Sequence, residues 1–332
     1  MAEKKEELKL IHMNEVEATE IKWLWYPYIP FGKITVIQGD PGDGKTTAVL
    51  AIAAAVTMGL PLPESKTAAE PMSVIFQTAE DGLGDTVKPR LLQSGADCER
   101  VIVIDESVKE LSLSDFRIEQ AITQTGAKLF ILDPLQAYIG ADVDMHRANE
   151  IRPVLKRISA VAEKTGCAMI VIGHLNKGMN KSQYRGLGSI DIQAAARSVL
   201  TIGRIKDKPY TRAIAQGKNN LAPEGQSIGF ELDPATGFRW LGVIPITIDE
   251  LLSSVMPVRD TTYDRAVDFL KSELAEGEKP AAFLFEKAAE QDISEKTLRG
   301  AKQALAVSSF KKEKRWYWAI LTHTKDIETD TL

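Results

Sequence analysis

The residues from Gly39 to Thr46 have the types and spacing of a phosphate-binding loop, G-x-x-x-x-G-K-[ST]. Gly39, Gly42 and Gly44 let the backbone turn and approach a phosphate without a Cβ in the way. The loop amides and the positive end of a following helix attract an anion. We expect the nucleotide to contact Gly39, Asp40, Pro41, Gly42, Asp43, Gly44, Lys45, Thr46 and Thr47.

Lys45 and Thr46 carry the chemistry of this loop. Lys45 is expected to reach the β- and γ-phosphates, and the Thr46 hydroxyl to hold Mg²⁺. An ordinary glycine-rich turn is the alternative. The setting favours the phosphate loop, because the β-branched run 34–37 precedes it and the Ala-rich segment 46–58, which lacks Pro and Gly, follows it. The sequence therefore predicts binding of ATP with Mg²⁺.

Polar side chains follow three further apolar runs, where strands are expected to end. Glu80 follows the run 73–77, Asp133 ends the run that begins at Lys128, and His174 follows the run 168–172. Ligands of open α/β sheets bind at the carboxyl edge of the strands. We expect Asp133 to hold Mg²⁺ opposite Thr46. A capping aspartate before a turn is the alternative for Asp133, and a structural histidine is the alternative for His174.

Strand and helix patterns alternate along most of the chain, and short hairpins follow between residues 199 and 241. This order predicts an α/β fold with a mostly parallel sheet and an antiparallel edge. Residues 21–32 are dense in aromatic side chains and contain two prolines. We predict an edge strand that caps the core there, with stacking of the aromatic rings on a nucleotide base as the alternative.

The composition is that of an ordinary soluble globular protein with about two domains. The chain has 332 residues, of which 44% are hydrophobic and 26% charged, with a net charge of −5. The two cysteines, Cys98 and Cys167, have no metal-ligand spacing and are expected to be buried free thiols. No apolar run approaches membrane-spanning length, and the charged start lacks a signal core. These features predict a cytoplasmic protein.

The motifs together resemble the RecA-like ATPase core, and more narrowly the plasmid and phage RepA/DnaB-type hexameric helicase ATPases. The shared order is G-D-P-G-D-G-K-T, F-Q-T-A-E-D, L-F-I-L-D-P-L and I-V-I-G-H-L-N-K, within residues 23–242. The resemblance implies that Glu80 polarises the attacking water and that His174 senses the γ-phosphate. It also implies that the loop 176–188, with Lys177, Lys181 and Arg185, contacts single-stranded DNA in the channel of a ring.

One stretch departs from the pattern of these relatives. The resemblance implies a Lys/Arg pair that reaches the phosphates bound by the neighbouring subunit. Here the matching residues are Q-G-K-N-N, so Lys218 is the candidate and no arginine accompanies it. Lysine is a weaker substitute for a planar, bidentate donor. The departure favours ATP hydrolysis over vigorous strand separation.

The C-terminal segment has a different pattern and predicts a small winged-helix domain. Helices are expected at 263–274, 281–291 and 294–305, with Ser294 as an N-cap, followed by a hairpin. The expected division of the chain is a lead-in at 1–20, the ATPase domain at 21–245, a linker at 246–262, the winged helix at 263–320 and a tail at 321–332. The residues expected to bind duplex DNA are Lys296, Arg299, Lys302, Lys311, Lys312, Lys314 and Arg315. A basic face that docks a protein is the alternative.

Three functions are compatible with these features. The first is a DNA-dependent, ring-forming ATPase motor of a phage, plasmid or other mobile element. The second is a DNA-binding regulator, loader or recombination mediator that uses ATP to assemble. The third, a small-molecule kinase, would need a lid rich in arginine and gives no role to the C-terminal domain.

Overall fold

The computed structural model describes residues 10–65, 68–140, 143–145, 147–174, 190–255, 262–275, 277–305, 307–313 and 315–319. The chain divides into two compact units, Met1–Val255 and Met256–Leu332. Each unit has a hydrophobic core of its own. In the part of the chain that is described, no helix is both long and apolar enough to cross a membrane.

The first unit is built on a nine-stranded sheet with the order β11-β10-β9-β8-β3-β7-β6-β4-β5. Neighbouring strands pair in parallel in the part β8-β3-β7-β6-β4-β5. In the part β11-β10-β9-β8 they pair in antiparallel fashion. The predicted α/β fold with a mostly parallel sheet is therefore confirmed. The strands are β3 (Ile34–Gly39), β4 (Val74–Thr78), β5 (Val101–Ile102), β6 (Leu129–Asp133), β7 (Ala168–His174), β8 (Ser198–Arg204), β9 (Thr211–Asn219), β10 (Ile228–Asp233) and β11 (Gly237–Val243).

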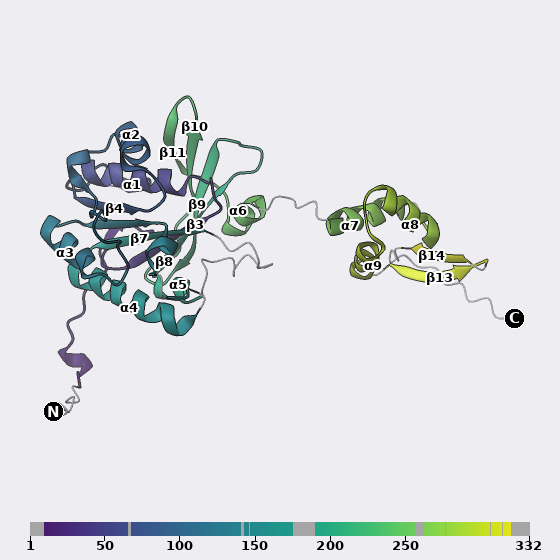
Figure 1. Ribbon diagram of the computed structural model, residues 1–332, viewed down its shortest axis with the longest axis horizontal. Coiled ribbons are helices and arrows are strands. Elements are labelled where there is room, and N and C mark those ends of the chain that lie inside the picture. The colour runs from purple at the N-terminus through teal and green to yellow at the C-terminus, as the bar shows by residue number, and fades with distance from the viewer. Residues whose placement is uncertain are drawn as a thin grey trace. The chain divides into compact units, whose positions relative to one another are not determined.

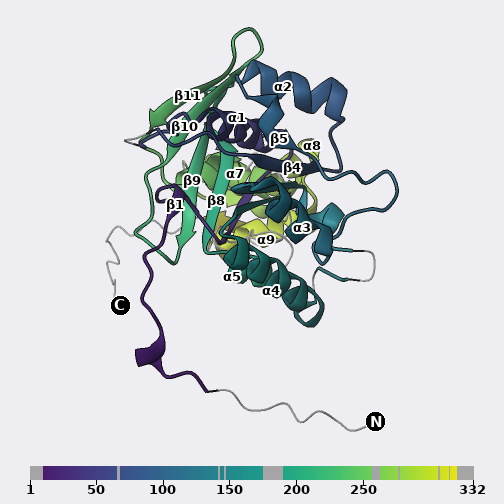
Figure 2. The same cartoon turned by 90° about the vertical axis from the view of Figure 1, so that its left-hand side faces the viewer.

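Helices cover both faces of this sheet, with α1 and α2 on one face and α3, α4 and α5 on the other (Figures 1 and 2). The strands of the parallel part are buried on both faces, which explains why their sequences are continuous apolar runs. The helices are α1 (Lys45–Met58), α2 (Lys88–Gln93), α3 (Phe116–Thr125), α4 (Ala148–Thr165), α5 (Ile190–Ala195) and α6 (Ile248–Val255).

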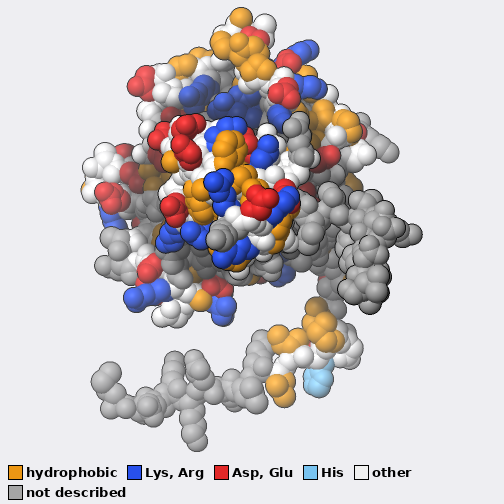
Figure 3. Space-filling model, turned by 90° about the vertical axis from the view of Figure 1, so that its right-hand side faces the viewer, with side chains coloured by type: hydrophobic (Ala, Val, Ile, Leu, Met, Phe, Trp, Pro, Cys, Tyr) orange, Lys and Arg blue, Asp and Glu red, His pale blue; other side chains and the backbone are white. Residues whose placement is uncertain are grey.

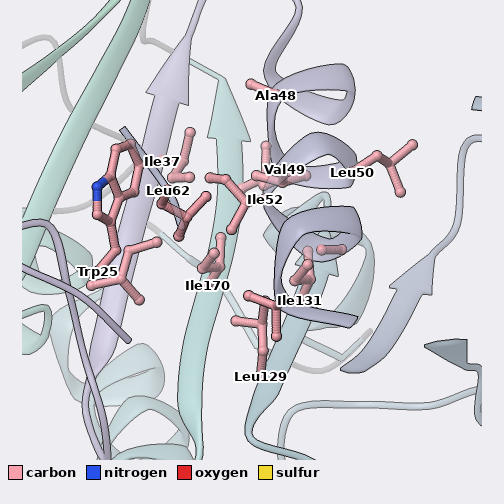
Figure 4. Close-up of a cluster of buried hydrophobic side chains, with 14 of the residues drawn as sticks. Trp25, Ile37, Ala48, Val49, Leu50, Ile52, Leu62, Leu129, Ile131 and Ile170 are labelled. Atoms are coloured by element: carbon pink, nitrogen blue, oxygen red, sulfur yellow. The ribbon is translucent and has the colours of Figure 1, made fainter. Parts of the chain in front are cut away.

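The helix after the phosphate loop, α1, lies in the centre of one core. Val49, Leu50 and Ile52 are fully buried, and Ile52 lies toward Ile170 of the sheet (Figure 4). A helix that is apolar on most sides needs cover on most sides. The sheet, α2 and the aromatic segment supply this cover, and they fix the start of α1 relative to the strand ends.

The aromatic segment forms a separate two-stranded sheet, β1 (Trp23–Trp25) and β2 (Ile29–Pro30), and not an edge of the central sheet. Trp25 and Tyr28 are buried, and the Tyr28 hydroxyl donates to the Gln226 carbonyl at 2.6 Å. The Trp25 indole donates to the Pro63 carbonyl at 2.8 Å. These contacts confirm that the segment caps the core, and they leave the rings of Trp25 and Tyr28 no face for a base.

The predicted linker is in part a helix. Helix α6 occupies residues 248–255 and contacts β8 and β9, with Leu251 fully buried. Residues 248–255 of the expected linker therefore form a helix that packs against the first unit. Residues 256–261 of the expected linker, and residues 320–332 around the expected tail, lie outside the described residues.

The described residues of the second unit form three helices and a three-stranded antiparallel sheet of order β12-β14-β13. Phe269, Leu284, Leu298 and Trp318 are central to its core. The Ser294 hydroxyl accepts from the amide of Thr297 at 3.2 Å, which confirms the predicted N-cap. The elements are α7 (Thr262–Glu273), β12 (Lys279–Pro280), α8 (Ala281–Glu290), α9 (Glu295–Ala304), β13 (Ser308–Lys312) and β14 (Arg315–Ala319).

Candidate functional site

The phosphate loop connects the carboxyl end of β3 to the first turn of α1. Gly39 is the last residue of β3, and Lys45 is the first residue of α1. Gly42 and Gly44 adopt the left-handed conformation, with φ of 80° and 85°. The loop therefore aims the start of a 14-residue helix at the strand edge, which is the arrangement that attracts phosphate.

The loop glycines also meet the antiparallel part of the sheet. A Cβ on Gly39 would collide with the carbonyl of Ile202 in β8, and one on Gly44 would collide with Leu232 in β10. The glycines thus serve a second purpose besides the approach of phosphate, because the loop lies directly against β8 and β10. This close packing supports the loop where it joins α1.

The Lys45 ammonium is folded back over the loop. Its Nζ donates to the carbonyls of Gly39 and Asp40 at 3.0 and 2.8 Å, and the residue is 6% exposed. Burial lowers the pKa of Lys45, and the neighbouring carboxylates of Asp43 and Asp133 oppose that shift. The amine is therefore placed to exchange carbonyl oxygens for phosphate oxygens with little movement.

Thr46 and Asp133 form the candidate magnesium site. The Thr46 hydroxyl donates to Asp133 Oδ2 at 2.6 Å across 87 residues of sequence. A hydroxyl and a carboxylate are hard oxygen donors, and Mg²⁺ in phosphate-loop proteins needs only one or two such ligands besides phosphate and water. The residues therefore fit Mg²⁺, which Thr46 and Asp133 would hold and which would offset the charge of the phosphates.

The pKa of Asp133 is raised from 3.8 to about 6. Burial is the main cause, the Thr46 hydrogen bond opposes it, and the charges of Glu80 and Asp81 add to it. Between these two pH values the folded chain keeps a proton that the unfolded chain has lost. Stability from this group is therefore present below pH 3.8 and is lost as the pH rises through about 6.

We predict that replacing Asp133 with asparagine removes this part of the pH dependence. Each pKa unit is worth about 1.4 kcal/mol, so the change is on the order of 3 kcal/mol between pH 4 and 7. Urea unfolding of both proteins in EDTA at several pH values measures it. Parallel stability curves for wild type and Asp133→Asn would contradict the assignment.

Glu80 lies two residues beyond the end of β4, at the same edge as Asp133. Thr78 is the register partner of Asp133 in the parallel pair β4/β6. The Thr78 hydroxyl accepts from the amides of Glu80 and Asp81, both at 3.3 Å, and Asp81 also pairs with Arg90 at 3.0 Å. The Glu80 side chain is exposed. A bound water between Glu80 and the loop would therefore have a carboxylate acceptor on one side.

The histidine and the basic loop are less fully described. His174 ends β7 in register with Gly39 of β3, so its backbone lies at the predicted edge, but its side chain lies outside the described residues. Lys177, Lys181 and Arg185 of the predicted DNA loop also lie outside the described residues. The structure therefore brings together Lys45, Thr46, Glu80 and Asp133.

Lys218 has a local role within its own chain. Its Nζ donates to the carbonyls of Gln193 at 2.6 Å, Ala196 at 2.9 Å and Ala194 at 3.5 Å. These carbonyls belong to the end of α5, so Lys218 caps that helix. Contact with a phosphate of a neighbouring subunit would require Lys218 to exchange all three carbonyls for it.

Two features of the site were missed in the sequence. Arg204 at the end of β8 bonds to the phosphate loop, donating from Nη2 to the Gly42 carbonyl at 2.9 Å. It follows an apolar run at a strand end, the same signal that identified Asp133. The second feature is the buried Gln77 of β4, which bonds to Glu106 and to the backbone of Ile104 and thereby fixes the loop after β5. No motif marks this pair.

The nine-stranded sheet, the phosphate loop and the paired threonine and aspartate define a RecA-like P-loop ATPase. The chain matches the AAA domain family over residues 3–180, which is more than half of its length, and it belongs to this family. It is also similar to the DNA repair protein RadA of Halalkalibacterium halodurans, with 25% identity over 148 residues. This alignment covers 44% of the present chain and 28% of that relative.

Proposed function

We propose that this chain is a DNA-dependent ATPase that assembles into a hexameric ring in the manner of replicative helicases and uses hydrolysis to move on DNA. The ATPase part rests on the phosphate loop, Thr46 and Asp133 meeting at one sheet edge. The similarity to a protein named for DNA repair supports the association with DNA. A phage, plasmid or other mobile element is the proposed origin, on the resemblance in sequence alone.

The proposed reaction is in-line attack of water on the γ-phosphate. Glu80 orients the water and accepts its proton, and Lys45 stabilises the charge that develops on the phosphate oxygens. His174 senses the γ-phosphate from the end of β7. In a ring, Lys218 of the next subunit would complete the site after leaving the end of α5.

The second unit is proposed to be a winged-helix domain that binds DNA. The element order α7, β12, α8, α9, β13, β14 supports this, with α9 as the recognition helix and the β13–β14 hairpin as the wing. Basic and acidic side chains are interspersed on the face turned to the viewer in Figure 3, so a DNA contact there has to be local.

Several of the expected DNA-binding cations have partners within the unit. Arg299 lies 3.5 Å from Glu295 and over the ring of Phe285. Lys302 lies over the ring of Trp318 and donates to the Ser309 hydroxyl at 2.5 Å, and Lys312 pairs with Glu278 at 2.7 Å. Lys314 lies outside the described residues. These contacts weaken the case for Arg299, Lys302 and Lys312 as primary phosphate ligands.

The DNA part of the proposal rests on exposed side chains of helix α9 and of the β13–β14 hairpin. Lys296, Lys311 and Arg315 are exposed, and none forms an ion pair with another described residue. Trp316 is 57% exposed and pairs across the hairpin with Lys311. An exposed aromatic ring between cations suits a nucleic acid, since the cations neutralise phosphates and the ring stacks on an unpaired base.

The proposal predicts that Lys311→Ala/Arg315→Ala binds labelled DNA about tenfold more weakly and with a salt dependence reduced by about two phosphate contacts. Fluorescence anisotropy at several salt concentrations measures both effects. Lys156→Ala/Arg157→Ala, on the outer side of α4, removes the same charge and is the matched control. Equal losses in the two double variants, or no loss in the first, would contradict this interface.

A second candidate is a regulator, loader or recombination mediator that needs ATP for assembly and does not separate strands. The bonds of Lys218 to the end of α5 favour it, because they occupy the proposed trans-acting cation within its own chain. This candidate predicts slow hydrolysis that single-stranded DNA does not stimulate, together with tight binding of duplex.

A further inference from the structure

We propose that Arg204 is a positioning residue that neutralises Asp43 inside the phosphate loop and thereby lets the loop accept the phosphates of ATP. Arg204 ends β8, and Asp43 lies 161 positions earlier in the chain. The Nε of Arg204 donates to Asp43 Oδ1 at 3.1 Å, and its Nη2 donates to the carbonyl of Gly42 at 2.9 Å. One guanidinium thus holds a side chain and a backbone carbonyl of the loop.

The Asp43 carboxylate is itself a part of the loop structure. Its side chain is 5% exposed, and its Oδ2 accepts from the amide of Asp40 at 3.2 Å. The amide of Asp43 in turn donates to the carbonyl of Asp40 at 3.3 Å. The carboxylate therefore ties the middle of the loop together with one oxygen and meets Arg204 with the other.

A buried negative charge at this position opposes the function of the loop. ATP brings several negative charges to the same amides, and like charges at close range repel. Burial raises the pKa of Asp43, while the hydrogen bond and charge of Arg204 lower it, as does the charge of Lys45. Asp40 adds a further negative charge. Arg204 is therefore the main cation that offsets Asp43, and Lys45 adds a smaller contribution.

The residues around the Arg204–Asp43 ion pair hold the guanidinium in place, unlike those around an ordinary surface ion pair. A Cβ on Gly42 would lie 3.2 Å from Nη2 of Arg204, so glycine at 42 also makes room for the guanidinium. Behind Arg204 lies Arg212, which is 6% exposed and donates to the carbonyl of Pro209 at 2.7 Å. The outer side of Arg204 is exposed, so the contribution of the pair to stability is small. The effect is expected on nucleotide affinity.

The test is a double-mutant cycle of Arg204→Gln, Asp43→Asn and the double variant in the full chain, with KM and kcat for ATP and the Kd of a fluorescent ATP analogue. Arg204→Gln should raise KM and Kd by roughly tenfold and change kcat less. Asp43→Asn should bind the analogue more tightly than the wild type. The double variant should recover most of the lost affinity, because it no longer contains the uncompensated carboxylate.

Two results would overturn the proposal. One is an Arg204→Gln protein with the KM and Kd of the wild type. The other is a double variant that binds as weakly as Arg204→Gln, since direct contact between Arg204 and the nucleotide cannot be restored by asparagine at 43. If Arg204→Gln does not fold, the comparison of Arg204→Met with and without Asp43→Asn asks the same question, because methionine also removes the charge. Thermal unfolding of each variant separates affinity from stability.

Discussion

Lys45→Ala is expected to lower ATP hydrolysis by at least about a hundredfold. The Lys45 amine lies buried over the loop, held by two loop carbonyls that phosphate oxygens can replace. Alanine removes the cation that stabilises charge on the transferred phosphate, and no other described lysine lies on the loop. The steady-state rate of phosphate release in the presence of Mg²⁺ measures the loss.

The control experiment for Lys45→Ala asks whether the variant still folds. Burial disfavours the charged form of Lys45, so its removal is not expected to unfold the chain. Thermal unfolding should therefore stay close to that of the wild type. A folded Lys45→Ala protein that hydrolyses ATP within about threefold of the wild-type rate would show that the phosphates are bound elsewhere.

Glu80→Gln is expected to retain ATP while turnover falls by at least about a hundredfold. Glutamine has the size of glutamate but does not accept the proton of the attacking water. Because the side chain keeps its size, the Kd of a fluorescent ATP analogue should stay within about threefold of the wild-type value. A single-turnover experiment separates the chemical step from binding.

Asp81→Asn is the matched control for this carboxylate. Asp81 is adjacent to Glu80, and its amide bonds to the same Thr78 hydroxyl, but its carboxylate pairs with Arg90 of α2. Its replacement should affect turnover only by a few fold. Normal turnover in Glu80→Gln with a large loss in Asp81→Asn would move the role of the base to Asp81.

Parts of the site could be predicted where a local sequence motif combines with the rule that parallel strands share their carboxyl edge. The phosphate loop has its own motif, and Asp133 follows an apolar run that ends at a strand edge. Because parallel strands share that edge, the meeting of Thr46 and Asp133 follows from the sequence, and the 2.6 Å hydrogen bond between them agrees with it. Glu80 is placed by the same reasoning.

Helix α6 has a helical pattern of apolar residues in its sequence, although the stretch was predicted to be a linker. Residues 248, 251, 252 and 255 are apolar and have the spacing of one helix face. Over the whole stretch 246–262 no clear periodicity is present, and Pro257 favours a linker. Leu251 is nevertheless fully buried in a small cluster with Ala213 and Ala215 of β9.

The contacts of Arg204 and Lys218 depend on how distant parts of the chain meet, and a single sequence does not specify them. Arg204 reaches the loop only because β8 pairs in parallel with β3, which no hydrophobic pattern reveals. Lys218 caps α5 because β9 returns beside β8 and brings its ammonium to that helix end. For both Arg204 and Lys218 the residue type indicates a contact with an acceptor, but the partner depends on the tertiary structure.

The most direct test of the account is the steady-state ATPase rate measured without DNA, with single-stranded DNA and with duplex, using Lys45→Ala as the blank. We expect a rate that is several-fold higher with single-stranded DNA than without DNA, and any increase caused by duplex should shrink in Lys311→Ala/Arg315→Ala. A rate above the blank that neither form of DNA changes would contradict a DNA-dependent ATPase.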